Sequence, residues 1–102
     1  MNKLLSNIGL AYKAKKIILG TDNIVEKMKT KKIKLVIMSA TSSFNTQKLI
    51  QDKANTYGVD VLLLDVDDTE ISHAIGRSNV KILGINDVGF KKMILKSIEG
   101  RN

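Results

Sequence analysis

Apolar residues recur along the chain in two alternating patterns, one typical of helices and one typical of strands. Five segments carry apolar side chains at helical spacing, and short, purely apolar runs lie between them. The predicted strands are 17–19, 35–38, 61–64 and 80–85. The predicted helices cover 3–14, a segment from a cap at Thr21 through Met28, a segment opened by Thr41–Ser43 and ended by Gly58, a segment from Asp67 or Asp68 to Gly76, and a segment from a cap at Asp87 through Ile98.

The alternation of strands and helices indicates the fold class. Leu35–Met38 and Val61–Leu64 are apolar without interruption, which is typical of strands that are buried on both faces. A sheet with such strands needs helices on both sides. We therefore expect an α/β protein, a single three-layer α-β-α sandwich with a central four-stranded mixed sheet, occupying residues 1–102 as one domain.

The helical spacing also assigns side chains to the core. In the third helix we expect Leu49, Ile50 and Ala54 to be buried, and in the last helix Met93 and Ile94. The aromatic residues are scattered and do not form the stacking platform of single-strand binders, so all of them are expected to be core or half-buried. They are Tyr12, Phe44, Tyr57 and Phe90.

Composition narrows the class of protein without changing the fold. The 102 residues are 43% hydrophobic and 26% charged, as in ordinary globular proteins. The chain has no cysteine, which excludes disulfides and thiolate metal sites. No apolar run approaches the roughly 18–20 residues of a membrane span, and the first residues do not resemble a signal peptide. We expect a cytoplasmic protein with no membrane contact, cofactor or metal.

The positive charge is concentrated in the first part of the chain. The formal net charge is +7, and residues 1–60 carry all of it, with eleven lysines against four acids. Residues 61–102 balance six basic groups with six acids. Most of the lysines fall in two clusters, 13–16 and 27–34. One-sided positive charge suits a polyanion, because each phosphate that is neutralised releases a counterion. An AT-rich genome would also raise the lysine content, although not its crowding at one end.

One motif points to an enzyme. Residues 61–69 match the hhhhDxDxT signature of haloacid-dehalogenase-like phosphatases, in which Asp65 would be the nucleophile and Asp67 the general acid beside magnesium. Only 37 residues follow Asp65, too few for that family's downstream lysine and acidic pair, and Glu70 replaces the usual apolar residue. We favour a strand end followed by an aspartate-capped helix. His73, the only histidine, is expected to face solvent, and we predict no enzymatic activity.

Six segments together resemble the kink-turn-binding ribosomal-protein family, and within it the short bacterial members of the YlxQ type. The resemblance covers nearly the whole chain, and the segments occur in the family's order. They are Gly-Leu-Ala in residues 8–15, the Lys-x-Lys-Leu-Val strand at 32–38, Asn-Thr-x-Lys at 45–48, a Glu-Leu-Gly-x-Ala-x-Gly-like segment at 70–76, the Ile-x-Asp-x-Gly-Phe ending at 85–91, and the lysine-rich strand, Gly-Thr and helix start at 15–27.

The resemblance implies a module that docks its second helix into a kink-turn, an RNA bend built on sheared G·A pairs. We expect a structured RNA partner, kink-turn-like or ribosomal, in a ribosomal or translation context, and a monomer when free. A helix N-terminus and nearby lysines suit phosphate binding. The expected RNA-binding residues are Lys15, Lys16, Gly20, Thr21, Asp22, Asn23, Glu26, Lys27, Lys31, Ile71, Ser72 and Arg77.

The chain departs from the family pattern Gly-Thr-Asn-Glu-x-x-Lys. Gly20 and Thr21 are kept, but Asp22, Asn23 and Glu26 replace Asn, Glu and Lys. Asp22 and Glu26 place negative charge where guanine edges and phosphates would approach. Three readings stay open: RNA recognition with a different or looser target, which we favour, a protein-interaction module whose RNA site has decayed, and, as a distant third, the phosphatase.

Overall fold

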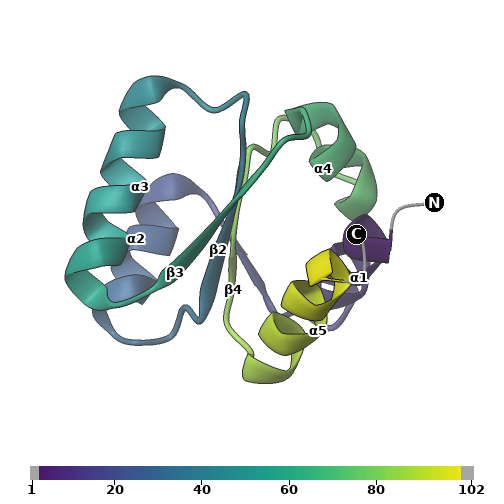
Figure 1. Ribbon diagram of the computed structural model, residues 1–102, viewed down its shortest axis with the longest axis horizontal. Helices are drawn as coiled ribbons and strands as arrows, with labels where there is room; N and C mark the ends of the chain where they lie inside the picture. The colour runs from purple at the N-terminus through teal and green to yellow at the C-terminus, as the bar shows by residue number, and fades with distance from the viewer. Residues whose placement is uncertain (1–2, 100–102) are drawn as a thin grey trace.

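The predicted elements form, with small changes in their bounds. The computed structural model describes residues 3–99 (Figure 1). The elements are α1 (Lys3–Lys13), β1 (Ile17–Leu19), α2 (Thr21–Lys29), β2 (Leu35–Ser39), α3 (Phe44–Tyr57), β3 (Asp60–Leu64), α4 (Asp68–Ile75), β4 (Ile82–Ile85) and α5 (Val88–Glu99).

The strands form one mixed sheet in the order β1-β4-β2-β3. β2 and β3 are parallel and are joined by α3, whereas β4 runs antiparallel to both of its neighbours, β1 and β2. Figure 1 shows α2 and α3 on one face of the sheet and α1, α4 and α5 on the other. The expected three-layer α-β-α sandwich with a four-stranded mixed sheet is confirmed.

The core has one half on each face of the sheet. β2 is buried along its whole length, and its side chains alternate between the two halves. Leu35 and Ile37 pack in the cluster under α1, α4 and α5, while Val36 and Met38 pack in the cluster under α2 and α3. A central strand with apolar residues at every position is what two helical layers require.

Four burial predictions are wrong. β3 is an edge strand with a neighbour on one side only, so Val61–Leu64 is not fully buried and Leu63 is 48% exposed. Leu49 and Met93 are also exposed, because each lies about 100° around its helix from the buried residue that follows it. Phe44, at the first position of α3, is 78% exposed.

The predicted helix caps are mostly correct, and the exception lies at α2. Ser43, Asp67 and Asp87 each accept a hydrogen bond from the backbone N–H three residues later, as N-cap side chains do. Thr21 does not cap α2, because Gly20 occupies the N-cap position with φ 90° and Thr21 is already helical. The last strand also starts later than predicted, at Ile82.

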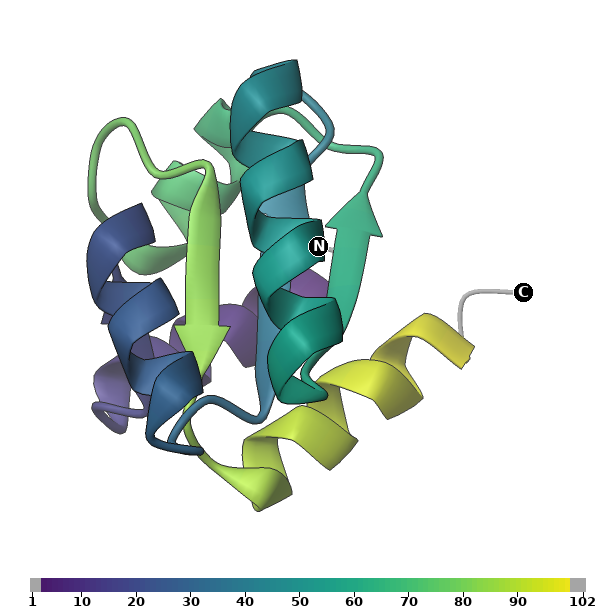
Figure 2. The ribbon, with the colours of Figure 1, turned by 90° about the vertical axis from the view of Figure 1, so that its left-hand side faces the viewer.

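The direction of the elements gives the sheet two functionally different ends. β1 leads into α2, whose N-terminus lies beside the N-terminus of α3 and the loop 77–81 that precedes β4 (Figure 2). We call this the Gly20 end (residues 20–23, 42–46 and 77–81). At the opposite end lie the turn 14–16 and the turn 30–34, beside the C-terminus of β4. We call this the lysine end (residues 15–16 and 31–34).

Candidate nucleic-acid interface

At the Gly20 end, a glycine starts α2 where a side chain would be strained. Gly20 has φ 90°, a conformation that L-residues rarely adopt, and its carbonyl accepts the first helical bond from the Ile24 N–H at 2.9 Å. Because the N-cap is a glycine, no N-cap side chain binds the first-turn N–H groups of α2. These N–H groups and the positive end of the helix dipole are therefore available to an anion.

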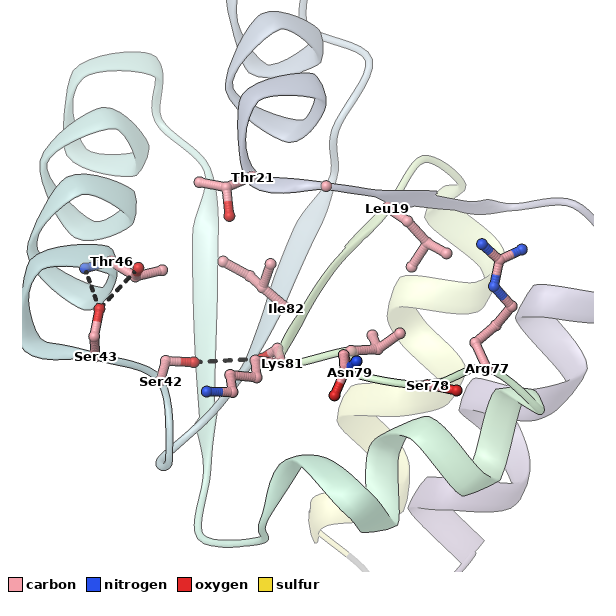
Figure 3. A pocket seen from close by; sticks show the side chains of 12 residues that line it. Leu19, Thr21, Ser42, Ser43, Thr46, Arg77, Ser78, Asn79, Lys81 and Ile82 are labelled. Atoms are coloured by element: carbon pink, nitrogen blue, oxygen red, sulfur yellow. Dashed lines mark hydrogen bonds between the residues drawn. The ribbon is translucent and has the colours of Figure 1, made fainter.

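Three segments meet around a hollow of about 370 Å³ at this end. Gly20 and Thr21 come from the start of α2, residues 42–46 from the start of α3, and residues 77–81 from the loop before β4 (Figure 3). Two helix N-termini thus contribute to one hollow, and Arg77 and Lys81 add formal positive charge to its lining. Hydroxyl and amide groups supply further donors and acceptors. This chemistry suits a phosphate and the polar edge of a base.

A buried serine fixes the loop 77–81. The Ser72 hydroxyl accepts a hydrogen bond from the Val80 N–H at 2.9 Å and donates one to the Val80 carbonyl at 3.3 Å. The Ser39 N–H donates to the Lys81 carbonyl at 2.8 Å, and the Arg77 N–H donates to the Ser72 carbonyl at 3.0 Å. The loop is therefore tied to α4 and to β2 at both of its ends.

Two of the expected RNA-binding residues are buried. Ile71 is fully buried and Ser72 is 6% exposed, so the structure places both side chains in the core beneath the loop. Ser72 acts on the hollow by holding the loop in place through its hydrogen bonds to Val80. Arg77 itself is exposed, and its guanidinium donates a hydrogen bond to the Tyr12 hydroxyl at 3.2 Å, which orients the side chain.

The exposed face of α2 carries the residues that depart from the family pattern. Asp22, Asn23 and Glu26 are exposed, and the Asn23 amide lies 3.4 Å from the Leu19 carbonyl. Glu26 forms an ion pair with Lys29 at 3.6 Å between two exposed side chains, which contributes at most about 0.5 kcal/mol to stability. Lys27 is half-buried further along the helix.

The remaining predicted lysines do not join this hollow. Lys15 and Lys16 precede β1, and Lys31 follows α2, so all three lie at the lysine end. The length of β1 separates Lys16 from Gly20 by about 13 Å. The nine residues of α2, Thr21–Lys29, span about 13 Å and separate Lys31 from the Gly20 end. The structure divides the predicted site into two groups at opposite ends of the sheet.

Sequence reasoning missed part of the hollow. Ser42, Ser43, Thr46, Asn79 and Lys81 all line it, but the topology that brings them to Gly20 was not visible in the sequence. Phe44 is a different case. Its exposure follows from the helical spacing, because a residue six positions before Ile50 lies about 120° away from the buried side.

The aspartates of the phosphatase-like motif lie where β3 ends and α4 begins. Asp67 accepts hydrogen bonds from the Thr69 hydroxyl and the Glu70 N–H, and these bonds, the first above all, lower the pKa of its carboxyl group. Asp65 is exposed, and His73 is exposed as predicted. Within residues 3–99, no three His, Asp or Glu side chains gather as a metal site would require, and no helix is long and apolar enough to cross a membrane.

Comparison with known proteins gives concordant results. The family model of the ribosomal protein L7Ae/L30e/S12e/Gadd45 family matches residues 2–95. The RNA-binding protein YlxQ of Enterococcus faecium is 36% identical over 98 residues, which is 96% of this chain and 93% of that protein. The RNA-binding protein YlxQ of Bacillus subtilis (strain 168) is 26% identical over 92 residues, 90% of this chain and 91% of its own.

Solved structures show the same fold. A protein of unknown function from Bacillus halodurans C superposes with a TM-score of 0.92 at 27% identity, covering 97% of this chain and 99% of that one. A Giardia lamblia 15.5kD RNA binding protein superposes with a TM-score of 0.80, covering 96% of this chain and 83% of that one. At 14% identity, the second similarity supports the fold alone.

Proposed function

Because the chain belongs to the ribosomal protein L7Ae/L30e/S12e/Gadd45 family, we propose that it binds structured RNA at the Gly20 end. One observation carries this proposal: two helix N-termini and a loop bearing Arg77 and Lys81 converge on a single hollow. Relatives that match over nearly their whole length are named RNA-binding proteins, which supports the same function.

Each group around the hollow has a role that its chemistry allows. The first-turn N–H groups of α2 bind a phosphate, because the helix dipole favours negative charge there. Arg77 and Lys81 neutralise neighbouring phosphates. Thr21 and Asn79 line the hollow and hydrogen-bond to base edges. Phe44 is exposed at the first position of α3, next in sequence to Ser43, which lines the hollow, and it offers a face on which an unpaired base stacks.

The target that we propose is a kink-turn or a related internal loop, in a ribosomal or translation context in the cytoplasm, bound by a monomer. The family resemblance supports this target. Asp22 and Glu26 change the kind of RNA that we expect to bind, since both carboxylates are exposed on the α2 face that would meet the RNA. A carboxylate accepts hydrogen bonds from base amino groups and repels phosphates, so these residues favour an RNA that presents bases rather than backbone to α2.

The deciding experiment is a gel-shift series with a kink-turn RNA and the same RNA with its G·A pairs broken, at several salt concentrations. We expect the intact kink-turn to bind more tightly. Lys81→Gln should weaken that binding, whereas Lys96→Gln, the same charge change at an exposed position on α5, should not. Equally weak, strongly salt-dependent binding of both RNAs would refute kink-turn recognition, and no binding at all would favour the protein-interaction function.

A further inference from the structure

Two turns at the lysine end are built in the same way. A turn follows each of α1 and α2, and in both turns the second residue after the helix has a left-handed backbone. These residues are Lys15, with φ 62°, and Lys31, with φ 64°, and each is followed by another lysine. The hydrogen bonds that close the two turns run from Lys15 N to Tyr12 O at 3.0 Å, from Lys16 N to Ala11 O at 2.9 Å, from Lys31 N to Met28 O at 3.1 Å and from Lys32 N to Lys27 O at 2.9 Å.

The backbone of these turns favours glycine, not lysine. The same chain places Gly58 and Gly76 in the left-handed position after α3 and α4. A Cβ is strained in that conformation, so the general expectation there is glycine. Lys15 and Lys31 therefore occupy positions where the fold alone would favour another residue. A side chain kept at a strained position is a pointer to a role outside folding.

The two turns are joined through the end of β4. The Asn86 N–H donates to the Lys16 carbonyl at 3.0 Å, and the Lys34 N–H donates to the Ile85 carbonyl at 2.7 Å. Because β1 and β2 lie on either side of β4, the two lysine segments are two strand spacings apart, about 10 Å. The sheet holds them at a fixed separation on one edge of the molecule.

Neighbouring groups leave this charge largely uncompensated. The Lys31 ammonium donates to the Tyr57 carbonyl at 3.4 Å, and the Lys34 ammonium donates to the Lys31 carbonyl at 3.1 Å. Both acceptors are uncharged, so neither contact is an ion pair. Asp60, a nearby acid, forms its ion pair with Lys91 at 3.0 Å. Lys15, Lys16 and Lys32 are exposed.

We propose that the lysine end binds the phosphate backbone of an RNA duplex arm that extends from the internal loop held at the Gly20 end. This second contact rests on the proposed function. The two ends are about 13 Å apart, the length of α2, which corresponds to roughly four to five base pairs of an A-form RNA duplex. Lysine ammonium groups on flexible stems bind phosphates without reading sequence, so this contact adds affinity but not base specificity.

The double variant Lys15→Gly/Lys31→Gly tests the proposal, because glycine removes each charge and also relieves the left-handed backbone. Its melting temperature should be unchanged or higher than that of the wild type. The matched control is Lys48→Gln/Lys96→Gln, which removes two charges from exposed positions outside the lysine end. Both variants and the wild type are titrated with one kink-turn RNA in two forms, with long arms and with arms trimmed to about two base pairs.

With the long-arm RNA, we expect the double variant to bind roughly tenfold more weakly than the wild type, and its log-log salt slope to fall by roughly 1.5 to 2 units. With the trimmed RNA, the two proteins should bind equally, and the control should behave like the wild type with both RNAs. Equal affinities of variant and wild type for the long-arm RNA would refute the second contact while leaving the proposed function intact. The same loss with both RNAs would also refute it, since the arm would then be irrelevant. A wild type that binds neither RNA would refute the proposed function, and this inference with it.

Discussion

Removal of one buried hydroxyl should loosen the loop that carries Arg77 and Lys81. In Ser72→Ala, the Val80 N–H loses its acceptor at 2.9 Å and the Val80 carbonyl loses its donor at 3.3 Å. Ser72 is 6% exposed and Val80 is 9% exposed, so water replaces these bonds poorly. The change deletes one oxygen and adds no bulk, so the effect comes from the two hydrogen bonds.

The size of the effect follows from those two bonds. A buried N–H left without an acceptor costs about 1–3 kcal/mol, and the longer bond to the carbonyl adds about 0.5 kcal/mol, so we expect about 2 kcal/mol in total. A chain of this length unfolds with an entropy near 0.2 kcal/mol per kelvin. Ser72→Ala should therefore lower the melting temperature by about 10 °C and also weaken RNA binding, because the loop loses its fixed position.

Thermal unfolding followed by circular dichroism measures the first effect, and RNA titration well below the melting temperature measures the second. Ser78→Ala, at an exposed serine of the same loop, is the control and should change the melting temperature by less than about 2 °C. A Ser72→Ala protein as stable as the wild type would show that the loop does not depend on this serine. Unchanged stability together with lost affinity would mean that Ser72 contacts the RNA directly, as the family resemblance implied.

Four further experiments have definite expected outcomes. Glu26→Lys should tighten kink-turn binding by about 1 kcal/mol or more without changing stability, and weaker binding would mean that Glu26 reads a base. Phe44→Ala should weaken RNA binding by about 1–3 kcal/mol while the melting temperature stays unchanged, because the ring is 78% exposed; equal affinity in titrations would refute the stacking role. Hydrogen bonds lower the folded-state pKa of Asp67. The stability that the ionised Asp67 contributes is therefore complete above the ordinary pKa of 3.8 and is lost as the pH falls through the lowered value. Asp67→Asn removes this contribution, so below about pH 4 its melting temperature should depend less on pH than that of the wild type. Magnesium should leave the melting temperature unchanged, and phosphomonoester turnover should be undetectable in both the wild type and Asp65→Asn. Magnesium-dependent turnover that is lost in Asp65→Asn would instead support the phosphatase function.

The fold was predictable because its strongest signals are local. Buried strands, helical spacing and the caps Ser43, Asp67 and Asp87 can all be recognised within a few residues, and the structure has them in place. The errors arose where burial depends on distant neighbours. Val61–Leu64 looks like a central strand, but its place at the sheet edge is set by which strands pair with β2, and no local pattern contains that information.

The candidate site was predictable only in part for the same reason. The Gly20–Thr21 junction is a local signal, and the structure places it at the hollow. The partners of this junction come from the starts of α3 and β4, more than 20 and more than 55 residues away, so only the topology brings them together. Lys15 and Lys31 are close to the junction in sequence, but a strand and a helix carry them to the opposite end. Nearness along the chain was misleading there.

The order of the strands also bears on how the protein is made. β4 lies between β1 and β2 in the sheet, although it is the last of the four strands along the chain. More than 60 residues separate Leu19 from Ile82, and at about 5–20 residues per second a ribosome needs several seconds to bridge them. During that time, β1 has no neighbour and β2 has one open edge. The sheet closes only after the 82–85 segment leaves the exit tunnel, so native structure forms late in synthesis and through distant pairings, which slows folding.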